Sequence, residues 1–161
     1  MRRDKVNYYL DIAEAVLGRG TCLRRKFGAI IVKNDEIVST GYAGAPRGRK
    51  NCCDIGSCRR MELGVAPGER YELCRSVHAE ANAIISASRD AMIGSVLFLA
   101  CRDSVSGELV SGTEPCSMCK RLIINAGIEK VYIRDTAEDY REFHVRDWIY
   151  YDDSLGDHKG Y

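Results

Sequence analysis

The sequence lacks the features that mark membrane and secreted proteins. No stretch approaches the ~20 consecutive apolar residues that a membrane-spanning helix needs. The charged N-terminus is not followed by the apolar run of a secretory signal. Proline is scarce, with three in 161 residues, and no internal repeat or low-complexity linker interrupts the chain. We therefore expect one compact domain over residues 1–161, located in the cytoplasm and without a membrane partner.

The chain also lacks an excess of charge of either sign. Its 24 Lys and Arg residues stand against 23 Asp and Glu residues, which gives a formal net charge of +1. Proteins that bind nucleic acid usually carry a strong basic excess on one face, so nucleic acid is disfavoured as a partner. A phosphate on a small substrate is compatible with this balance, because one or two well-placed arginines suffice to bind it.

The spacing of apolar residues predicts alternating helices and strands. Helices are expected over residues 4–17, 78–88, 116–126 and 140–150. Strands are expected over residues 27–32, 36–42, 95–101 and 129–134, and the first two form a hairpin. Strands separated by helices of this length indicate a layered α/β domain.

Cysteine, by contrast, is abundant, with eight residues. In the cytoplasm these thiols stay reduced, so metal binding or catalysis explains them better than disulfides do. Four of them lie in residues 43–74, a long and weakly periodic segment that we interpret as an insertion. A structural zinc ion bound by several of these cysteines would stabilise the fold of such a segment. The ligands we expect for it are Cys22, Cys52, Cys58 and Cys74.

Cys53 is then the spare cysteine. The alternatives are that these residues are small buried thiols, or that only some of them pair. Cys101 lies in an apolar strand and is most simply a core residue.

Two short motifs each open a predicted helix. His78 and Glu80 belong to the first, and Pro115, Cys116 and Cys119 belong to the second. The two cysteines are three residues apart and so share a helix face, at a helix end that favours thiolate over thiol. With the imidazole of His78 they make a three-ligand zinc site with one open position, which is the mark of a catalytic zinc.

Glu80 lies close to such a metal but is poorly placed to ligate beside His78. Its carboxylate can take a proton from an activated water and pass it to a ring nitrogen and then to a leaving amine. H-x-E together with P-C-x-x-C is the signature of zinc-dependent deaminases. The alternatives are a core histidine with a redox pair, which would not need Glu80, or a closed structural site, which would need a fourth ligand.

With these motifs the chain resembles the deoxycytidylate deaminases, including the late-competence-operon type of Gram-positive bacteria. The resemblance covers residues 4–148. It is carried by G-A-I-I-V at 28–32, G-Y-A-G-A-P-R-G at 41–48, C-R-S-V-H-A-E at 74–80 and P-C-S-M-C at 115–119. It implies a three-layer α/β/α cytidine-deaminase-like fold with a central five-stranded mixed sheet. It also implies zinc-dependent hydrolysis of dCMP to dUMP and ammonia, which supplies thymidylate synthesis.

The resemblance further implies a homo-oligomer, with a hexamer favoured. Many members of the family are activated by dCTP and inhibited by dTTP with Mg²⁺. An arginine at the position of Arg89 is similar to one that helps to bind these effectors. The alternative for Arg89 is a solvated cation near a helix C-terminus, where positive charge is favoured.

The chain departs from the family pattern at Ala43. The family has G-Y-N-G at this point, and its Asn contacts the sugar of the nucleotide. Alanine cannot make that hydrogen bond, and a buried polar partner left unpaired costs about 1–3 kcal/mol. Three explanations stay open: another residue holds the sugar, the substrate is not dCMP, or the protein is a weakened variant.

Other substrate contacts are expected from isolated residues. Arg24, with Arg25 beside it, and Arg121 are candidates for binding a phosphate, and surface charge is their alternative. Tyr140 resembles the family's ring-stacking tyrosine, and helix packing is its alternative.

Two competing functions are weighed against dCMP deamination. A deaminase of tRNA adenosine, guanine or dCTP would share the two motifs, but a nucleic-acid enzyme would want a basic surface. A zinc-stapled binding protein without turnover would have no need of Glu80.

Overall fold

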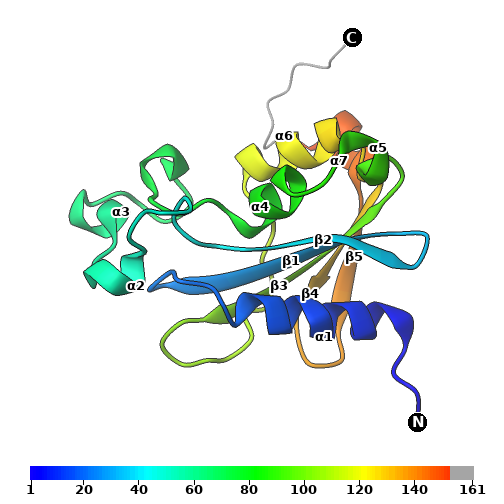
Figure 1. Ribbon diagram of the computed structural model, residues 1–161, viewed down its shortest axis with the longest axis horizontal. Helices are drawn as coiled ribbons and strands as arrows, with labels where there is room; N and C mark the ends of the chain where they lie inside the picture. Colours follow the sequence, from blue (N-terminus) through cyan, green and yellow to red (C-terminus); the bar gives the residue numbers. More distant parts are fainter. Residues whose placement is uncertain (153–161) are drawn as a thin grey trace.

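The computed structural model describes residues 1–152 (Figure 1). No helix in this part of the chain combines the length and the apolarity required to cross a membrane. The elements in chain order are α1 (Lys5–Leu17), β1 (Arg25–Lys33), β2 (Glu36–Tyr42), α2 (Cys52–Ile55), α3 (Arg59–Glu62), a 3₁₀ turn (Tyr71–Leu73), α4 (Ala79–Ile85), α5 (Arg89–Met92), β3 (Val96–Asp103), α6 (Ser117–Ala126), β4 (Lys130–Arg134), β5 (Tyr140–His144) and α7 (Val145–Tyr151).

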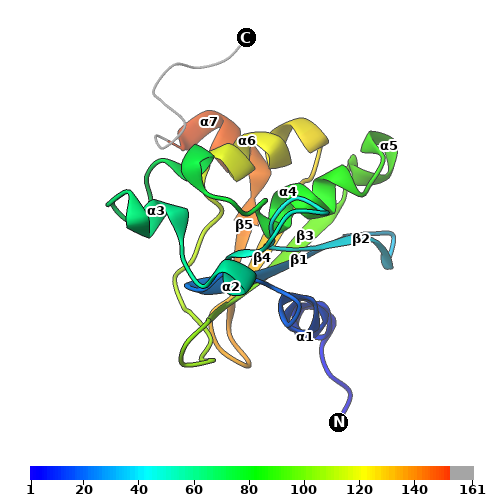
Figure 2. The same cartoon turned by 60° about the vertical axis from the view of Figure 1, so that its left-hand side comes forward.

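The strands form one five-stranded sheet in the order β2-β1-β3-β4-β5. β3 and β4 are parallel, and the other neighbouring pairs are antiparallel. Helix α1 covers one face of the sheet, while α4, α6 and α7 cover the other (Figures 1 and 2). The three-layer fold with a five-stranded mixed sheet, expected from the sequence, is therefore confirmed.

The central strands are apolar on both faces because helices cover both. Ile30 and Phe98 pack with Tyr9 and Leu10 of α1. Their neighbours along β1 and β3, among them Ile31 and Leu97, join the larger core under α4 and α6. This alternation explains why these strands read as continuous hydrophobic runs in the sequence.

The expected helix over residues 140–150 is wrong in its first half. Residues 140–144 form β5, an edge strand antiparallel to β4, and the helix begins only at Val145. Exposure alternates along β5, with Arg141 and Phe143 the less exposed residues. That period of two fits a half-buried edge strand and not a helix.

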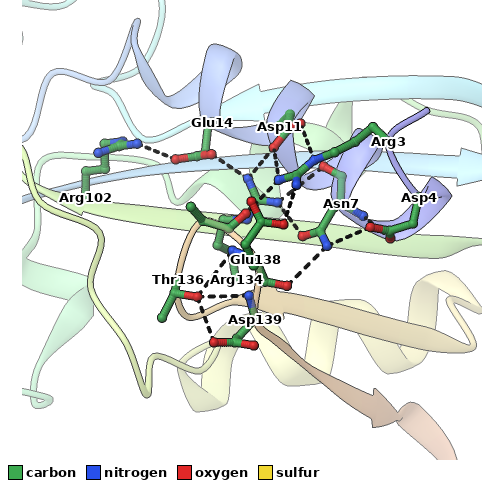
Figure 3. Close-up of polar contacts among 11 residues, drawn as sticks. Arg3, Asp4, Asn7, Asp11, Glu14, Arg102, Arg134, Thr136, Glu138 and Asp139 are labelled. Atoms are coloured by element: carbon green, nitrogen blue, oxygen red, sulfur yellow. Dashed lines mark hydrogen bonds and ion pairs between the residues drawn. The ribbon is translucent and has the colours of Figure 1, made fainter. Parts of the chain in front are cut away.

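Helix α1 is fastened to the sheet by a buried ion network (Figure 3). Arg134, at the end of β4, is 1% exposed. Its Nη1 donates to Asp11 Oδ1 at 2.6 Å and to Glu14 Oε2 at 2.5 Å, and its Nη2 donates to Asn7 Oδ1 at 2.6 Å. The network therefore holds α1 against the face of the sheet opposite to α4 and α6, the helices that the two motifs open.

Candidate metal centre and substrate cavity

The two motifs come together because the helices that they open lie on the same face of the sheet. His78 is the N-cap residue of α4, and Cys116 is the N-cap residue of α6. A short bridge fixes the chain before His78: Val77 N donates to Gly44 O at 2.7 Å, and Gly44 N donates back to Val77 O at 3.2 Å. The predicted convergence of two helix starts is thus present.

Three donor atoms converge at this point. His78 Nδ1 lies 3.5 Å from Cys116 Sγ and 3.5 Å from Cys119 Sγ. Within residues 1–152, these three residues form the group of potential metal ligands whose donor atoms all lie within 4.8 Å of one another. One imidazole nitrogen and two sulfurs are a donor set that zinc prefers, and no fourth side chain of the described chain closes the group.

The charges in this group favour exchange of protons for a cation. The hydrogen bond from Cys119, together with that from His78, lowers the pKa of Cys116 to about 4 despite partial burial. Hydrogen bonding to Cys116 and then to Cys74 raises the pKa of His78 to about 10. A divalent cation would bind the thiolate and the imidazole nitrogen and would displace the imidazole proton.

Glu80 lies beside the three donors and is 3% exposed. Burial raises the pKa of its carboxyl group, and hydrogen bonding with Cys119 acts in the opposite direction. A carboxyl whose pKa is raised above its ordinary value can both accept and return a proton, as a general acid–base catalyst must.

A cavity of about 350 Å³ opens over this group. His78, Glu80 and Cys116 form part of its lining. Its other lining residues are Cys22, Arg24, Arg25, Phe27, Ala43, Arg60, Pro67, Gly68, Tyr71, Cys74, Ser76, Ala79, Gly112, Thr113 and Glu114. This volume suits a small organic ligand.

Some of the substrate candidates line the cavity. Arg24 does, and Ala43 lines it with 6% of its surface exposed. Arg121 is exposed on α6, and Tyr140, at the start of β5, stacks edge-on against Tyr132; neither lines the cavity. Arg89 also lies outside it.

Arg89 is the first residue of α5, and its Nε donates to Asn125 O at 3.2 Å. Asn125 belongs to the last turn of α6. The guanidinium thus lies at the C-terminus of α6, where the helix dipole favours a cation.

Residues 43–74 supply a wall of the cavity that the sequence did not reveal. The Tyr71 ring stands edge-on to the His78 ring, with 5.1 Å between centroids and an interplanar angle of 85°. Arg60 stacks over the other side of this wall, with its guanidinium carbon 4.4 Å from the Tyr71 centroid. Thr113 adds a buried hydroxyl that has no hydrogen-bond partner among the described residues. No periodic pattern in residues 43–74 points to these positions.

Of the four cysteines expected to hold a structural zinc, three lie near the fourth, Cys52. Burial raises the pKa of Cys52, and the nearby Cys22, Cys74 and Cys58 raise it further. Cys53 N donates to Thr21 O at 3.2 Å, which ties the insertion to the segment that bears Cys22. Their sulfur atoms are not gathered as closely as the donors at His78, so a metal would have to draw them together.

Comparison with known proteins identifies the family. The model of the cytidine and deoxycytidylate deaminase zinc-binding region matches residues 3–134. A deoxycytidylate deaminase of Mycobacterium phage D29 is 37% identical over 81% of this chain and 94% of its own length. One from Schizosaccharomyces pombe is 31% identical over 78% of this chain, and the match spans 35% of that longer protein.

A solved structure agrees with these sequence matches. The dCMP deaminase of cyanophage S-TIM5, crystallised with dCMP and dUMP, superimposes with a TM-score of 0.61 at 29% identity. The superposition covers 97% of this chain and 95% of the phage enzyme. Residues 3–134, which the family model matches, contain both motifs and strands β1 to β4. The chain therefore belongs to the cytidine and deoxycytidylate deaminase family.

Proposed function

We propose that this protein hydrolyses dCMP to dUMP and ammonia and so supplies thymidylate synthesis. The observation that carries the proposal is the convergence of His78, Cys116 and Cys119 beside the buried Glu80, at a cavity of nucleotide-compatible size. The relatives named deoxycytidylate deaminases support the choice of substrate.

His78, Cys116 and Cys119 would hold one zinc ion, because their donor atoms are of the type and number of a catalytic zinc site. When bound, zinc supplies a Lewis acid that makes water an effective nucleophile near neutral pH.

Glu80 would move the protons of the reaction. Its carboxylate oxygen takes a proton from the attacking water and delivers it to N3 of the cytosine ring. The water oxygen bonds to C4, the proton of the resulting hydroxyl passes through the same carboxyl to the exocyclic amine, the bond from C4 to that nitrogen breaks, and ammonia leaves while C4 keeps a carbonyl oxygen. Burial of Glu80 excludes competing water from this path.

Ala43 occupies the cavity wall without a polar side chain. Of the three explanations, we favour a sugar held by another residue. Thr113 supports this, because the residue lines the same cavity and its buried hydroxyl is unpaired within the described chain. Its backbone carbonyl accepts from Arg141 Nη2 at 2.6 Å, which fixes the position of the loop.

Several further features are proposed with the activity. Cys22, Cys52, Cys58 and Cys74 would bind a second zinc ion. A zinc content of two ions per chain that falls to one in Cys52→Ser would support this site.

The family resemblance leads us to propose a homo-oligomer, preferably a hexamer. It also leads us to propose control by dCTP, dTTP and Mg²⁺, with Arg89 as a contact. Reduced thiol ligands support a cytoplasmic location.

The test is ammonia release by the zinc-loaded protein from dCMP, CMP, dCTP, deoxycytidine, guanine and a tRNA anticodon stem-loop, each with and without dCTP as effector. Turnover of dCMP well above the others is expected. Activity confined to another substrate would overturn the assignment and give Ala43 a role in changed specificity. Inactivity on every substrate would favour the binding protein without turnover.

A further inference from the structure

Three cationic side chains are buried within residues 1–152: Arg60, Lys120 and Arg134. Lys120 Nζ lies 2.6 Å from a carboxylate oxygen of Asp152 and 3.4 Å from one of Glu114. Arg134 pairs with Asp11 and Glu14 (Figure 3). Arg60 is as buried as Lys120, at 5% exposed, yet no carboxylate of the described chain forms an ion pair with it.

The acceptors around Arg60 are neutral. Its Nη2 donates to Glu69 O at 2.7 Å and to Ala66 O at 3.1 Å, and its Nε donates to Glu69 O at 3.1 Å. The described chain offers no acceptor to Nη1. Backbone carbonyls orient the guanidinium but do not neutralise it, so a full positive charge stays buried, which is costly without a counter-charge.

This charge lies at the cavity described above. Arg60 lines it together with Arg24, Arg25 and Glu80. Tyr71 stands between Arg60 and His78, with its ring in contact with both. One aromatic ring therefore separates the unpaired cation from the candidate metal centre.

The backbone before Tyr71 is held in an uncommon conformation. Arg70 has φ +52°, in the left-handed region that L-residues other than Asn and Asp seldom adopt. Such a conformation is retained when the surrounding structure requires it. Here it turns the chain so that Tyr71 and the carbonyl of Glu69 both reach Arg60.

We infer that Arg60 binds the 5′-phosphate of the nucleotide substrate, so that the insertion selects a nucleoside monophosphate over a free nucleoside. This inference rests on the proposed function. A phosphate supplies the missing counter-charge, and Nη1 offers it a donor that no group within residues 1–152 uses. Tyr71 holds the guanidinium plane by cation–π stacking and spaces it from the reacting end of the cavity.

The test compares Arg60→Gln with the parent, both zinc-loaded, on dCMP and on deoxycytidine. The KM for dCMP should rise at least about tenfold, as expected for a lost charge-assisted hydrogen bond, while kcat/KM for deoxycytidine stays within about twofold. Arg59→Gln is the matched control. It lies on the same short helix but is exposed and pairs with Glu62, so both substrates should behave as with the parent.

A purely structural Arg60 predicts different results. In that case Arg60→Gln lowers kcat/KM for both substrates in proportion, or for neither, and the inference fails. Should Arg60→Gln not fold, Arg60→Lys serves instead, because it keeps the charge but loses the planar fork. A selective rise in the KM for dCMP supports the inference, and an equal change for both substrates overturns it.

Binding without turnover separates this inference from the proposed reaction. The dissociation constants of dUMP, deoxyuridine and inorganic phosphate would be measured on the parent and on Arg60→Gln. A preference for dUMP over deoxyuridine that is lost in the variant supports the phosphate site even if dCMP proves not to be a substrate. Inorganic phosphate that competes with dUMP equally well in both proteins overturns it.

Discussion

Gly41 lies so close to Ala79 that a Cβ atom on the glycine would stand 2.4 Å from the alanine carbonyl oxygen. The same atom would lie 2.4 Å from Ala83 N. Strand β2 therefore supports the first turn of α4 directly, and this turn follows His78 and contains Glu80. Gly41→Ala should push α4 away, cost about 1–3 kcal/mol of stability and weaken zinc retention. Urea unfolding and the zinc content of the purified protein measure the two effects.

Gly28 provides the control on the opposite face of the sheet. A Cβ atom there would lie 2.3 Å from Ala13 O in α1, so Gly28→Ala should destabilise the fold to a similar degree. Because α1 does not carry the metal donors, the folded fraction of Gly28→Ala should keep its zinc. Equal zinc loss in both variants would contradict the support that we assign to Gly41.

Glu80→Gln should abolish turnover while leaving the fold and the metal in place. Glutamine has nearly the same shape as glutamate, but it cannot accept and return a proton. We expect kcat to fall by about 10²–10⁴, the usual contribution of a general acid–base group. Ammonia release and zinc content are measured together, with the exposed Glu36→Gln as control. Parental turnover in Glu80→Gln would contradict the mechanism.

Arg134→Met should destabilise the protein far more than the loss of an exposed arginine does. It removes a buried partner from both Asp11 and Glu14, and breaking a buried ion pair costs about 3–5 kcal/mol; because Arg3 and Arg102 still pair with these carboxylates, we expect a loss near the lower end of that range. Arg3→Met removes a partner of the same Asp11, but both groups are partly exposed, so we expect a loss below about 1 kcal/mol. Urea unfolding of the two variants gives the comparison, and similar losses would contradict a structural role for the network.

The same network predicts a dependence of stability on pH. Partial burial would raise the pKa of Asp11, but hydrogen bonds from Arg3 and Arg134 outweigh it and hold the pKa below its ordinary value of 3.8. The unfolded chain then binds more protons in acid, so this contribution is complete above about pH 4 and is lost as the pH falls through the folded pKa. Because the side chain is nearly half exposed, the contribution should stay below about 1 kcal/mol.

Asp11→Asn isolates this effect. The difference in unfolding free energy between the parent and Asp11→Asn should be largest near neutral pH and should shrink below pH 4. Any loss of zinc in acid affects both proteins and cancels in the difference. A difference that grows toward acid would reverse the assigned sign.

The metal donors could be predicted from the sequence because local spacing decides their geometry. Cys116 and Cys119 share a helix face at a helix start, and the pairing of His78 with Glu80 is specific to one chemistry. Arg121 could not be placed in the same way. It follows Cys119 by two residues, which turns it about 200° around the helix and away from the cavity.

The features that the sequence did not reveal depend on distant parts of the chain. Arg60 is held at the cavity because the chain folds back and places the carbonyls of residues 66 and 69 against its guanidinium. The pattern of apolar residues in the sequence does not indicate this fold-back. Strand β5 is short and lies at the sheet edge, so its alternation over five residues was too brief to separate from a helical pattern. Pairing with β4, and not local preference, makes it a strand.

His78 and Cys116 are both N-cap residues, and each is positioned by a helix that packs on the same face of the sheet. The spacing of the donor atoms is therefore set by the packing of the two helices and not by the chain that joins the motifs. Segment 104–112, between β3 and the second motif, is mostly exposed, and we expect changes in its length to leave the metal geometry in place. Variation in its length would remodel the rim of the cavity while the chemistry below stayed constant, which gives this architecture a simple route to new substrates.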